Sequence, residues 1–586
     1  MIHRVTVLLS YLLIVGLTLS ACNAGGFSIP TVQFGQTQAS GIIETIAPIQ
    51  SLPPTPTSTP IPLGIWVSRA IPENLRKVVE SWDIPLVETP GAASLHLDMV
   101  KQPVLDGGTA SWIYALVTPF PTIVDDVTGE ELREAWNRNQ PGSFANQPIL
   151  MDKATLETFT ALWGVPATGS VRTVEADQIM DTAWAHQPSW AIIPFEALEP
   201  RWKVLSVDGQ SPLHNDFEPG GYPLVSFFSI KCSEPCPVSP LPTLPATNRD
   251  PSKLTVLVMT GVTALVRATA FTMEIKGITY PGLDVGDWLR YADIAHISNE
   301  IPFDPDCPSP NPNESKLIFC SDPRYIGLLE DIGTDVIELT GNHFQDRGSQ
   351  ATLDTLEMYK ERDWIYYGGG ANLEDAIKPR TMEHNGNKLA FIGCNPAGPS
   401  FAWATENQPG AAPCDYHYMV EQIQLLRAQG YLPIASFQYQ EYYSPEPRPW
   451  QQRDFRLLAD AGAVVVSGSQ AHFAQAMEFY HGSFIHYGLG NLFFDQMNDE
   501  GTRREFLDRH IFYDGRYIGT ELLTAMLVDY CRPLPMTKQE RGDFLTFIFD
   551  ASGWGSNFPT PTPTLTLTLT PMKLPIYTTP SPTNLP

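Results

Sequence analysis

The chain has 586 residues, more than one hydrophobic core usually serves, so its length predicts at least two folded domains. Its formal net charge of -27 excludes nucleic acid and anionic lipid headgroups as electrostatic partners and disfavours nonspecific capture of a polyanion. After the first twenty residues, no segment is long and apolar enough to be expected to cross a bilayer.

The beginning of the chain is typical of an export signal. A basic start, Met1 to Arg4, precedes an apolar segment that ends at Leu19, and the next residues, Ser20-Ala21-Cys22, resemble a bacterial lipoprotein box. Residues 1–22 are therefore predicted to be a lipoprotein signal peptide, with Cys22 as the lipidated N-terminus after cleavage. Ordinary signal cleavage without lipidation is the alternative. We expect the protein to be exported and anchored through this lipid at the outer face of the bacterial cytoplasmic membrane.

Two segments have the composition of unfolded chain. Residues 23–62 are rich in Gly, Gln, Thr and Pro, and residues 558–586 alternate Thr with Pro and Leu. Such sequences bury too little apolar surface to offset the entropy of ordering, and their prolines keep them extended. The first is predicted to be a disordered stalk and the second a disordered tail.

Residues 63–245 alternate short apolar strands with amphipathic helices, which predicts an α/β domain. Strands are expected at 63–67, 84–87 and 112–117. One helix is expected to begin after Pro72 and another to end at Gly164. The segments 190–194, 203–209 and 222–224 resemble the closing lobe of phosphate-type solute-binding proteins, although no Ser/Thr-Gly cluster that would cradle phosphate is present. A ligand cleft and a vestigial lobe used only for contacts are both open.

The chain has eight cysteines, and an exported protein favours disulfides between them. With Cys22 set aside, the pairs nearest in sequence leave Cys531 over, and none has zinc-site spacing. The candidate disulfides are Cys232 with Cys236, Cys307 with Cys320, and Cys394 with Cys414. The proline-rich segment that follows Cys232 predicts an interdomain linker.

Polar side chains follow two apolar strands of the second predicted domain, residues 252–550. The strand Val336 to Leu339 is followed by Gly341-Asn342-His343, and the strand Val464 to Val466 is followed by Gly468-Ser-Gln-Ala-His472. In open α/β sheets the ligand crevice lies beyond the carboxyl ends of the strands, so these side chains are expected to share it. With the segment 483–495, this pattern resembles the CapA-type capsule (poly-γ-glutamate) synthesis family over about residues 252 to 500. The resemblance implies a four-layer α/β/β/α fold of the calcineurin-like metallophosphoesterase kind.

Three positions depart from the family's metal-binding pattern. Val262 stands in place of an aspartate, and Gln438 and Gln470 stand in place of histidines. By the resemblance, a candidate metal set of Glu300, Asn342, Gln470 and His472 remains, with His343, Asp346 and Arg267 as catalytic candidates. Amide oxygens with one carboxylate favour a single hard cation, Mg, Mn or Ca, over a zinc pair, and they weaken a two-metal reaction.

The leading hypothesis is a surface-anchored CapA-like lipoprotein that acts in capsule, anionic exopolymer or envelope assembly with a degenerate metal site. Its expected partners are an anionic exopolymer, envelope-assembly proteins and the membrane, but not nucleic acid. The first alternative is an active metal-dependent phosphoesterase or polymer hydrolase in which His343 protonates the leaving group. The second is a solute-binding lipoprotein that uses the first domain. Fold similarity alone does not decide among them.

Overall fold

The computed structural model describes residues 62–555, except 104–107, 139–143 and 145–146. The predicted signal peptide with Cys22, the stalk and the tail lie outside the described residues. Residues 60–586 cluster as one compact unit, and the domain boundary predicted near residue 245 stays a prediction. Within the described ranges, no helix combines the length and the apolarity that a membrane crossing requires.

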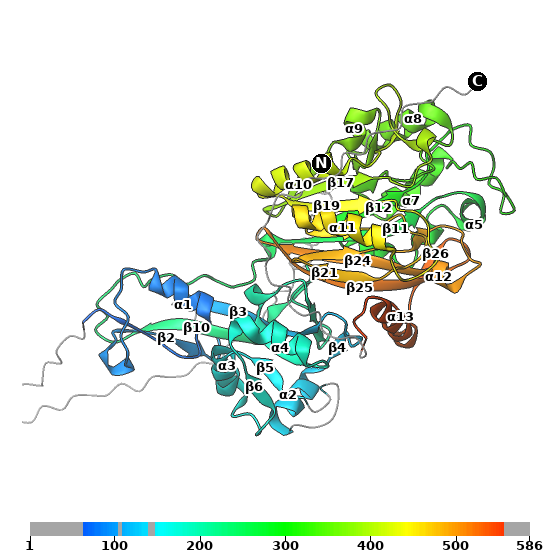
Figure 1. Cartoon of the computed structure of the whole chain (residues 1–586). Helices are drawn as coiled ribbons and strands as arrows, with labels where there is room; N and C mark the ends of the chain where they lie inside the picture. Colours follow the sequence, from blue (N-terminus) through cyan, green and yellow to red (C-terminus); the bar gives the residue numbers. More distant parts are fainter. Residues whose placement is uncertain (1–61, 104–107, 139–143, 145–146, 556–586) are drawn as a thin grey trace, which may run out of the picture. The chain divides into compact units, whose positions relative to one another are not determined.

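The first part of the described chain forms an eight-stranded mixed sheet in the order β1-β2-β10-β3-β7-β5-β6, with β8 paired to β3 (Figure 1). β1 runs parallel to β2, and β5 runs parallel to both β6 and β7, whereas β3 is antiparallel to β10 and β7. The strands are β1 (Ile65–Val67), β2 (Leu95–Val100), β3 (Thr109–Pro119), β5 (Ile149–Met151), β6 (Val171–Thr173), β7 (Trp190–Pro194), β8 (Trp202–Val204) and β10 (Val225–Cys232). β4 (Asp126–Val127) and β9 (Ser206–Val207) form a separate parallel pair.

The helices of this part are α1 (Glu73–Glu80), α2 (Gly129–Arg138), α3 (Lys153–Trp163) and α4 (Ile179–Ala185). α3 begins where Asp152 accepts a 2.7 Å hydrogen bond from the Thr155 amide, and it ends at Gly164, whose φ of 89° suits glycine. The α/β prediction is thus confirmed. The strand predicted at 84–87 is wrong: only an isolated bridge, Ile65 to Leu86, forms there. Pro85 has no N–H with which to extend the ladder.

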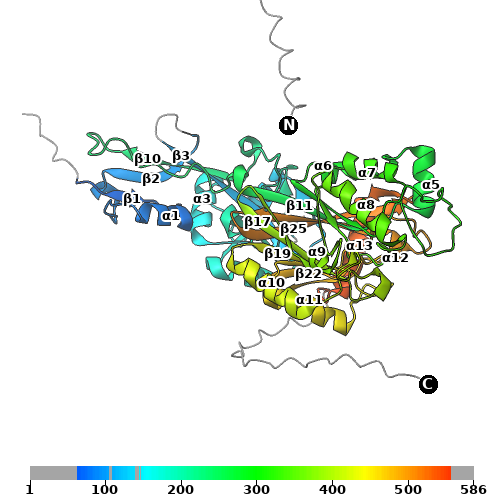
Figure 2. The same ribbon diagram turned by 90° about the horizontal axis from the view of Figure 1, so that it is seen from above.

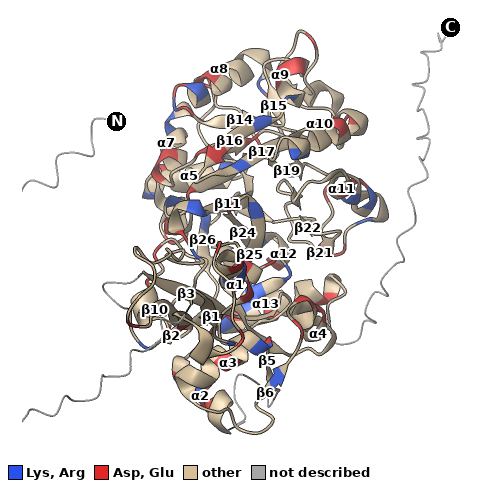
Figure 3. Cartoon of the chain, turned by 90° about the vertical axis from the view of Figure 1, so that its left-hand side faces the viewer, with Lys and Arg blue, Asp and Glu red and all other residues tan. Residues whose placement is uncertain are grey.

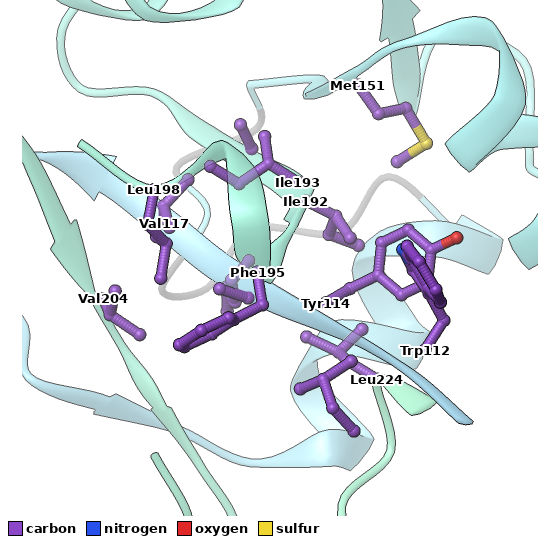
Figure 4. Close-up of a cluster of buried hydrophobic side chains, with 14 of the residues drawn as sticks. Trp112, Tyr114, Val117, Met151, Ile192, Ile193, Phe195, Leu198, Val204 and Leu224 are labelled. Carbon is purple, nitrogen blue, oxygen red and sulfur yellow. The ribbon is translucent and has the colours of Figure 1, made fainter. Parts of the chain in front are cut away.

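The core beside this sheet is built from buried residues of its central strands and of the turn after β7. Tyr114 and Trp112 of β3, Ile192 and Ile193 of β7, and Phe195 lie together there (Figure 4). Each of these side chains is at most 3% exposed. A fully buried Phe or Ile stabilises the fold by roughly 1.5–3 kcal/mol.

Two further sheets make up the rest of the molecule. One has the order β14-β13-β12-β11-β24-β25-β26, with β23 paired to β11, and the other the order β16-β17-β19-β20-β22-β21. The first contains β11 (Leu254–Thr263), β12 (Ile294–Asn299), β13 (Val336–Glu338), β14 (Ile365–Tyr367), β23 (Asn491–Phe493), β24 (Arg504–Tyr513), β25 (Arg516–Val528) and β26 (Arg532–Pro535). The second contains β16 (Arg380–His384), β17 (Asn387–Cys394), β19 (Leu432–Phe437), β20 (Val465–Ser467), β21 (Met477–Tyr480) and β22 (Ser483–His486). β15 (Gly369–Gly370) and β18 (Gly410–Ala411) form a small separate pair.

Three cores define the layer order of these two sheets. Leu257, Ile294 and Val336 of the first sheet share a core with Phe391 and Ile434 of the second, so the sheets pack face to face. The outer face of the first sheet packs on α5 (Arg267–Lys276), α6 (Gly286–Arg290), α7 (Ile326–Asp331) and α8 (Gly348–Lys360), and that of the second on α10 (Tyr416–Ala428) and α11 (Pro449–Ala461) (Figure 2). The predicted four-layer α/β/β/α fold is confirmed.

Short helices and one long helix complete the chain. α9 (Leu373–Ile377) and α12 (Glu500–Arg503) lie between strands, and α13 (Lys538–Ala551) adds Phe544, Leu545 and Ile548 to the core between the sheets. α11 begins at Pro449, because proline is well suited to the first turn of a helix.

The three predicted disulfides are present. Cys232 is bonded to Cys236, Cys307 to Cys320, and Cys394 to Cys414. Cys531 is a buried free thiol. The disulfides therefore use the pairs nearest in sequence, as the spacing suggested.

Candidate functional site

The parallel strands β11, β12 and β13 end at the same edge of the sheet to which they belong. β11 pairs with β12 and β12 with β13, so Thr263 lies opposite Asn299 and Ser298 opposite Glu338. Glu300 follows β12, and Asn342 and His343 follow β13. A Cβ on Gly341 would lie 2.7 Å from the Glu300 Cα, so only glycine lets these two segments approach so closely.

The loop after β20 reaches the same edge from the other sheet. Gly468 is required at its start, because a Cβ there would lie 1.9 Å from the Tyr487 carbonyl oxygen. Gln470 donates a 2.6 Å hydrogen bond from Nε2 to Ser298 Oγ on β12. This bond joins the two sheets and brings His472 to the strand ends.

His472 lies between two carboxylates. Its Nε2 is 3.7 Å from Glu300 Oε1 and 3.5 Å from Glu441 Oε1, while its Nδ1 hydrogen-bonds Asn491 Oδ1 at 2.8 Å. Burial lowers the pKa of His472, but Glu300 and Glu441 outweigh burial and raise it to about 9. The hydrogen bond with His472 lowers the pKa of Glu441 to about 2. At neutral pH the site therefore holds an imidazolium between two carboxylates.

The expectation of a single carboxylate at this site is wrong. Glu441 is the second one, and it comes from the loop after β19, where Gln438 replaces the family's histidine. Gln438 itself is buried, and its Oε1 accepts a 2.9 Å hydrogen bond from Asn395 Nδ2. Val262 is fully buried on β11, between Ser298 of β12 and Asn491 of β23.

His343 is held by Asp346. Its Nδ1 and Asp346 Oδ2 are 2.6 Å apart, and the same oxygen accepts a 2.8 Å bond from the Phe319 amide. The His343 ring packs on the Phe319 ring with centroids 4.4 Å apart. Burial lowers the pKa of His343, but Asp346 and the negative charge of Glu300 together raise it. The imidazole is thus oriented, 17% exposed and well placed to donate a proton.

Arg267 is already paired. Its guanidinium forms a two-point ion pair with Asp495, and the Ala268 amide donates to the same carboxylate at 3.0 Å. Its Cζ lies 4.8 Å from the Phe319 ring centroid and 5.0 Å from that of Phe494. Arg267 also has a φ of 48°, uncommon for a residue other than glycine. The arrangement fixes Arg267 as a support for the loop that carries Phe319.

Several oxygens at this edge are buried without a partner. Among the described residues, both Glu300 carboxylate oxygens, Asn342 Oδ1 and Gln470 Oε1 accept no hydrogen bond. Unpaired hard oxygens are the ligands that one Mg²⁺, Mn²⁺ or Ca²⁺ ion prefers. No three His, Cys, Asp or Glu side chains of the described part converge closely enough to hold a metal ion. The unpaired oxygens are thus of the kind that a hard cation would use.

Glu338 is the buried acid that sequence reasoning left without a role. It is fully buried at the end of β13, where it accepts hydrogen bonds from Thr340 Oγ1 at 2.6 Å and from Ser469 Oγ. Burial raises its pKa, although the surrounding hydroxyls act in the opposite direction. Glu338 comes directly after two β-branched residues of the central strand, and this position was the sequence signal that it is buried. Glu338 links β13 to the loop that carries Gln470 and His472.

A separate cavity of about 240 Å³ lies beside the N-terminal sheet, which contains β1 to β3, β5 to β8 and β10. Its acidic lining residues are Glu73, Asp152, Asp177, Glu196 and Glu199, against which Arg201 is the single basic one. Burial raises the pKa of Glu196, which accepts hydrogen bonds from Trp112 and Asn248. This lining disfavours an anion such as phosphate in that cavity.

Part of the chain is similar to known proteins. Residues 256–496 match the family model described as bacterial capsule synthesis protein PGA_cap. The predicted resemblance to the CapA-type capsule synthesis family is confirmed. The match runs from β11 to β23 and contains every candidate metal-binding and catalytic residue, whereas β24, β25 and β26 lie beyond its end. The N-terminal sheet, which ends with β10 at Cys232, also lies outside the matched residues.

Two curated CapA proteins are similar to this chain. The capsule biosynthesis protein CapA of Bacillus anthracis is 27% identical over 257 residues, which are 43% of this chain and 62% of that protein. The PGA biosynthesis protein CapA of Bacillus subtilis is 30% identical over 227 residues, which are 38% of this chain and 59% of that protein. The chain thus spans about three fifths of the length of the curated relatives that it matches.

Solved structures are similar at a coarser level. A 5'-nucleotidase precursor from Thermus thermophilus has 14% identity and a TM-score of 0.29 over 51% of this chain and 58% of that one. An ABC-type phosphate transport receptor from Vibrio cholerae has 15% identity and a TM-score of 0.24 over 29% of this chain and 85% of that one. The layer order described above comes from the sheets and cores themselves.

Proposed function

We propose that this protein is a surface-anchored CapA-like lipoprotein that acts in the assembly of an anionic exopolymer of the poly-γ-glutamate type, with a metal site too incomplete for paired-cation catalysis. The position of His472 between Glu300 and Glu441 carries the proposal. An imidazolium there neutralises carboxylates that would otherwise draw a second cation. A pair of metal ions would also need charged or imidazole ligands at three positions that hold a valine and two amides instead, Val262, Gln438 and Gln470.

A groove beside the site fits the anionic polymer. It has a volume of about 740 Å³ and is lined by four basic residues, Arg267, Lys316, Arg324 and Arg347, and by three acidic ones, Glu274, Glu314 and Asp322. Arg267 and Arg347 are paired with Asp495 and Asp304. Arg324 is paired with Glu274 at 2.8 Å and with Asp322 at 3.0 Å, but its side chain is 60% exposed, and Lys316 is exposed. A chain of net charge -27 therefore offers cationic side chains next to its candidate site. Polymer binding there is expected to be salt-dependent, since exposed charges are screened.

Metal stoichiometry tests the proposed site. The purified whole protein is dialysed against Mn²⁺ and Zn²⁺, and bound metal is measured together with hydrolysis of p-nitrophenyl phosphate. The proposal predicts at most one loosely held ion per chain. It also predicts that the protein has no phosphatase turnover that depends on His343, so that His343→Ala changes nothing. Two tightly held ions, or turnover lost in that variant, would establish the rival hydrolase instead.

Polymer binding tests the proposed role. Labelled poly-γ-glutamate is titrated into the whole protein at two salt concentrations, and Lys316→Gln with Arg324→Gln is expected to weaken binding several-fold. Lys538→Gln is the matched control, because Lys538 is 90% exposed on α13 and outside the groove. Equal binding by the groove variant and the control would contradict the proposed role.

The unpaired oxygens favour a second candidate, a hydrolase that uses one hard cation. Glu300, Asn342 and Gln470 would hold the ion, and it would supply Lewis-acid polarisation when bound. In that case His343, oriented by Asp346, would donate the proton to the leaving group. Turnover that depends on added Mg²⁺ or Mn²⁺ and on His343 separates this candidate from the first.

A further inference from the structure

A second cavity lies away from the candidate site, within the compact unit 60–586. It has a volume of about 250 Å³, and we refer to it as the junction cavity. Its walls come from the segment 120–125, β8, β24, β25 and α13, so elements more than 300 residues apart in sequence face one another across it. α13 carries both basic and acidic residues, with Lys538 and Arg541 beside Glu540, Asp543 and Asp550; Figure 3 shows the charged positions of the chain in blue and red.

Two carboxylates of the junction cavity each contact two cationic partners. Asp125 accepts bonds of 2.7 and 2.9 Å from Arg541 and contacts Lys203 Nζ at 2.7 Å. Glu521 contacts His214 Nε2 at 3.0 Å and Arg509 Nη1 at 3.0 Å. Lys203 and the two arginines give three fixed positive charges against two negative ones. The cavity thus carries surplus positive charge in a strongly acidic protein.

Arg509 keeps a complete carboxylate-binding edge unused. Among the described residues it hydrogen-bonds through Nη1 alone, to Glu521. Its Nε–H and Nη2–H donors form the fork that binds a carboxylate through two parallel hydrogen bonds. The side chain is only 18% exposed, so a donor pair left without an acceptor there costs stability.

Lys203 adds another donor to the same cavity. Its ammonium donates to the Thr122 carbonyl at 2.6 Å and contacts Asp125, and its third N–H has no acceptor within the described part of the chain. Burial lowers the pKa of Lys203 to about 8, although Asp125 opposes this, so the group is still mostly protonated at pH 7. The remaining wall is apolar and is formed by Phe120, Leu522, Leu545 and Phe549.

We propose that the junction cavity binds a small organic carboxylate, with the carboxylate group on the Nε–Nη2 edge of Arg509 and the apolar part against Phe120 and Leu545. The volume accommodates roughly eight water-sized groups at about 30 Å³ each, which excludes a polymer chain from the interior. This binding site is separate from the strand-end site and does not depend on the proposed function.

Calorimetric titration of the whole protein with hexanoate tests this proposal, with hexanamide as the neutral counterpart and inorganic phosphate as an anion without an apolar part. We expect saturable binding of hexanoate, at least tenfold weaker binding of hexanamide, and no competition by phosphate. No saturable binding of hexanoate, equal binding of hexanamide, or displacement by phosphate at equal concentration would overturn the proposal.

Arg509→Lys tests the proposed contact. It keeps a positive charge that can pair with Glu521 but removes the Nε–Nη2 edge, so hexanoate should bind at least tenfold more weakly. Arg532→Lys is the matched control, because Arg532 also pairs with a carboxylate, that of Asp284, but lies outside the cavity. If Arg509→Lys unfolds, Leu545→Trp fills the apolar end instead and should abolish binding. Unchanged affinity in the folded variant contradicts the proposal.

Discussion

Replacing His472 by Gln removes the positive charge that balances Glu300. His472 and Glu300 are 4% and 1% exposed, so the change leaves a buried carboxylate without its cation. The pKa of His472 rises from 6.5 to about 9, and each pKa unit corresponds to about 1.36 kcal/mol, so the charged contacts stabilise the fold by about 3 kcal/mol. Breaking a buried ion pair from one side costs a similar amount, about 3–5 kcal/mol.

Urea unfolding at pH 7 measures this loss, with the strand amides of β11 and β12 followed by hydrogen exchange. His417→Gln is the control, because His417 is 75% exposed, and it should change the unfolding free energy by less than about 0.5 kcal/mol. In His472→Gln with Glu300→Gln, the second substitution should recover much of the loss. A loss below about 1 kcal/mol, or strictly additive effects, would refute the reasoning.

The stability that His472 contributes depends on pH with a definite sign. The folded-state pKa lies above the usual value, so the contribution is complete below about pH 6.5 and disappears as the pH rises through about 9. The difference in stability between the native protein and His472→Gln should therefore shrink between those two pH values.

Three other results are expected. Burial raises the pKa of Glu521, but His214 and Arg509 outweigh burial and lower it to about 2, so the stability that Glu521 contributes is present above about pH 4.5 and lost as the pH falls towards 2. Glu521→Gln should flatten that part of the curve of stability against pH, and an unchanged curve would contradict the pairing. Loss of the Cys394–Cys414 disulfide, which spans 20 residues, should cost about 3 kcal/mol in thermal unfolding, whereas an unchanged Tm would argue against it. Gly468→Ala places a Cβ 1.9 Å from a backbone oxygen and should destabilise the protein by about 3 kcal/mol in urea, and a neutral effect would contradict the loop geometry.

The sequence predicted the strand-end positions because strand periodicity and glycine stops are local signals. Asn342 and His343 follow β13, and His472 follows β20, at the edge where parallel strands bring distant segments together. The disulfide pairs followed from proximity in sequence for the same reason.

The side-chain pairings were beyond the sequence because they depend on loops with no periodic pattern. Glu441 reaches His472 from an irregular loop, and Asp495 forms an ion pair with the guanidinium of Arg267. The junction cavity depends on Arg509 of β24 and Lys203 of β8, which no motif connects. The predicted catalytic and metal-binding roles stay predictions for all of these residues: Arg267, Glu300, Asn342, His343, Asp346, Gln470 and His472.

Anomalous diffraction from crystals of the whole protein grown in Mn²⁺ tests the central claim most directly. We predict at most one anomalous peak at the strand-end site, within reach of the oxygens of Glu300, Asn342 and Gln470. Two peaks about 3.5–4 Å apart, the spacing of a paired-cation centre, would contradict this prediction.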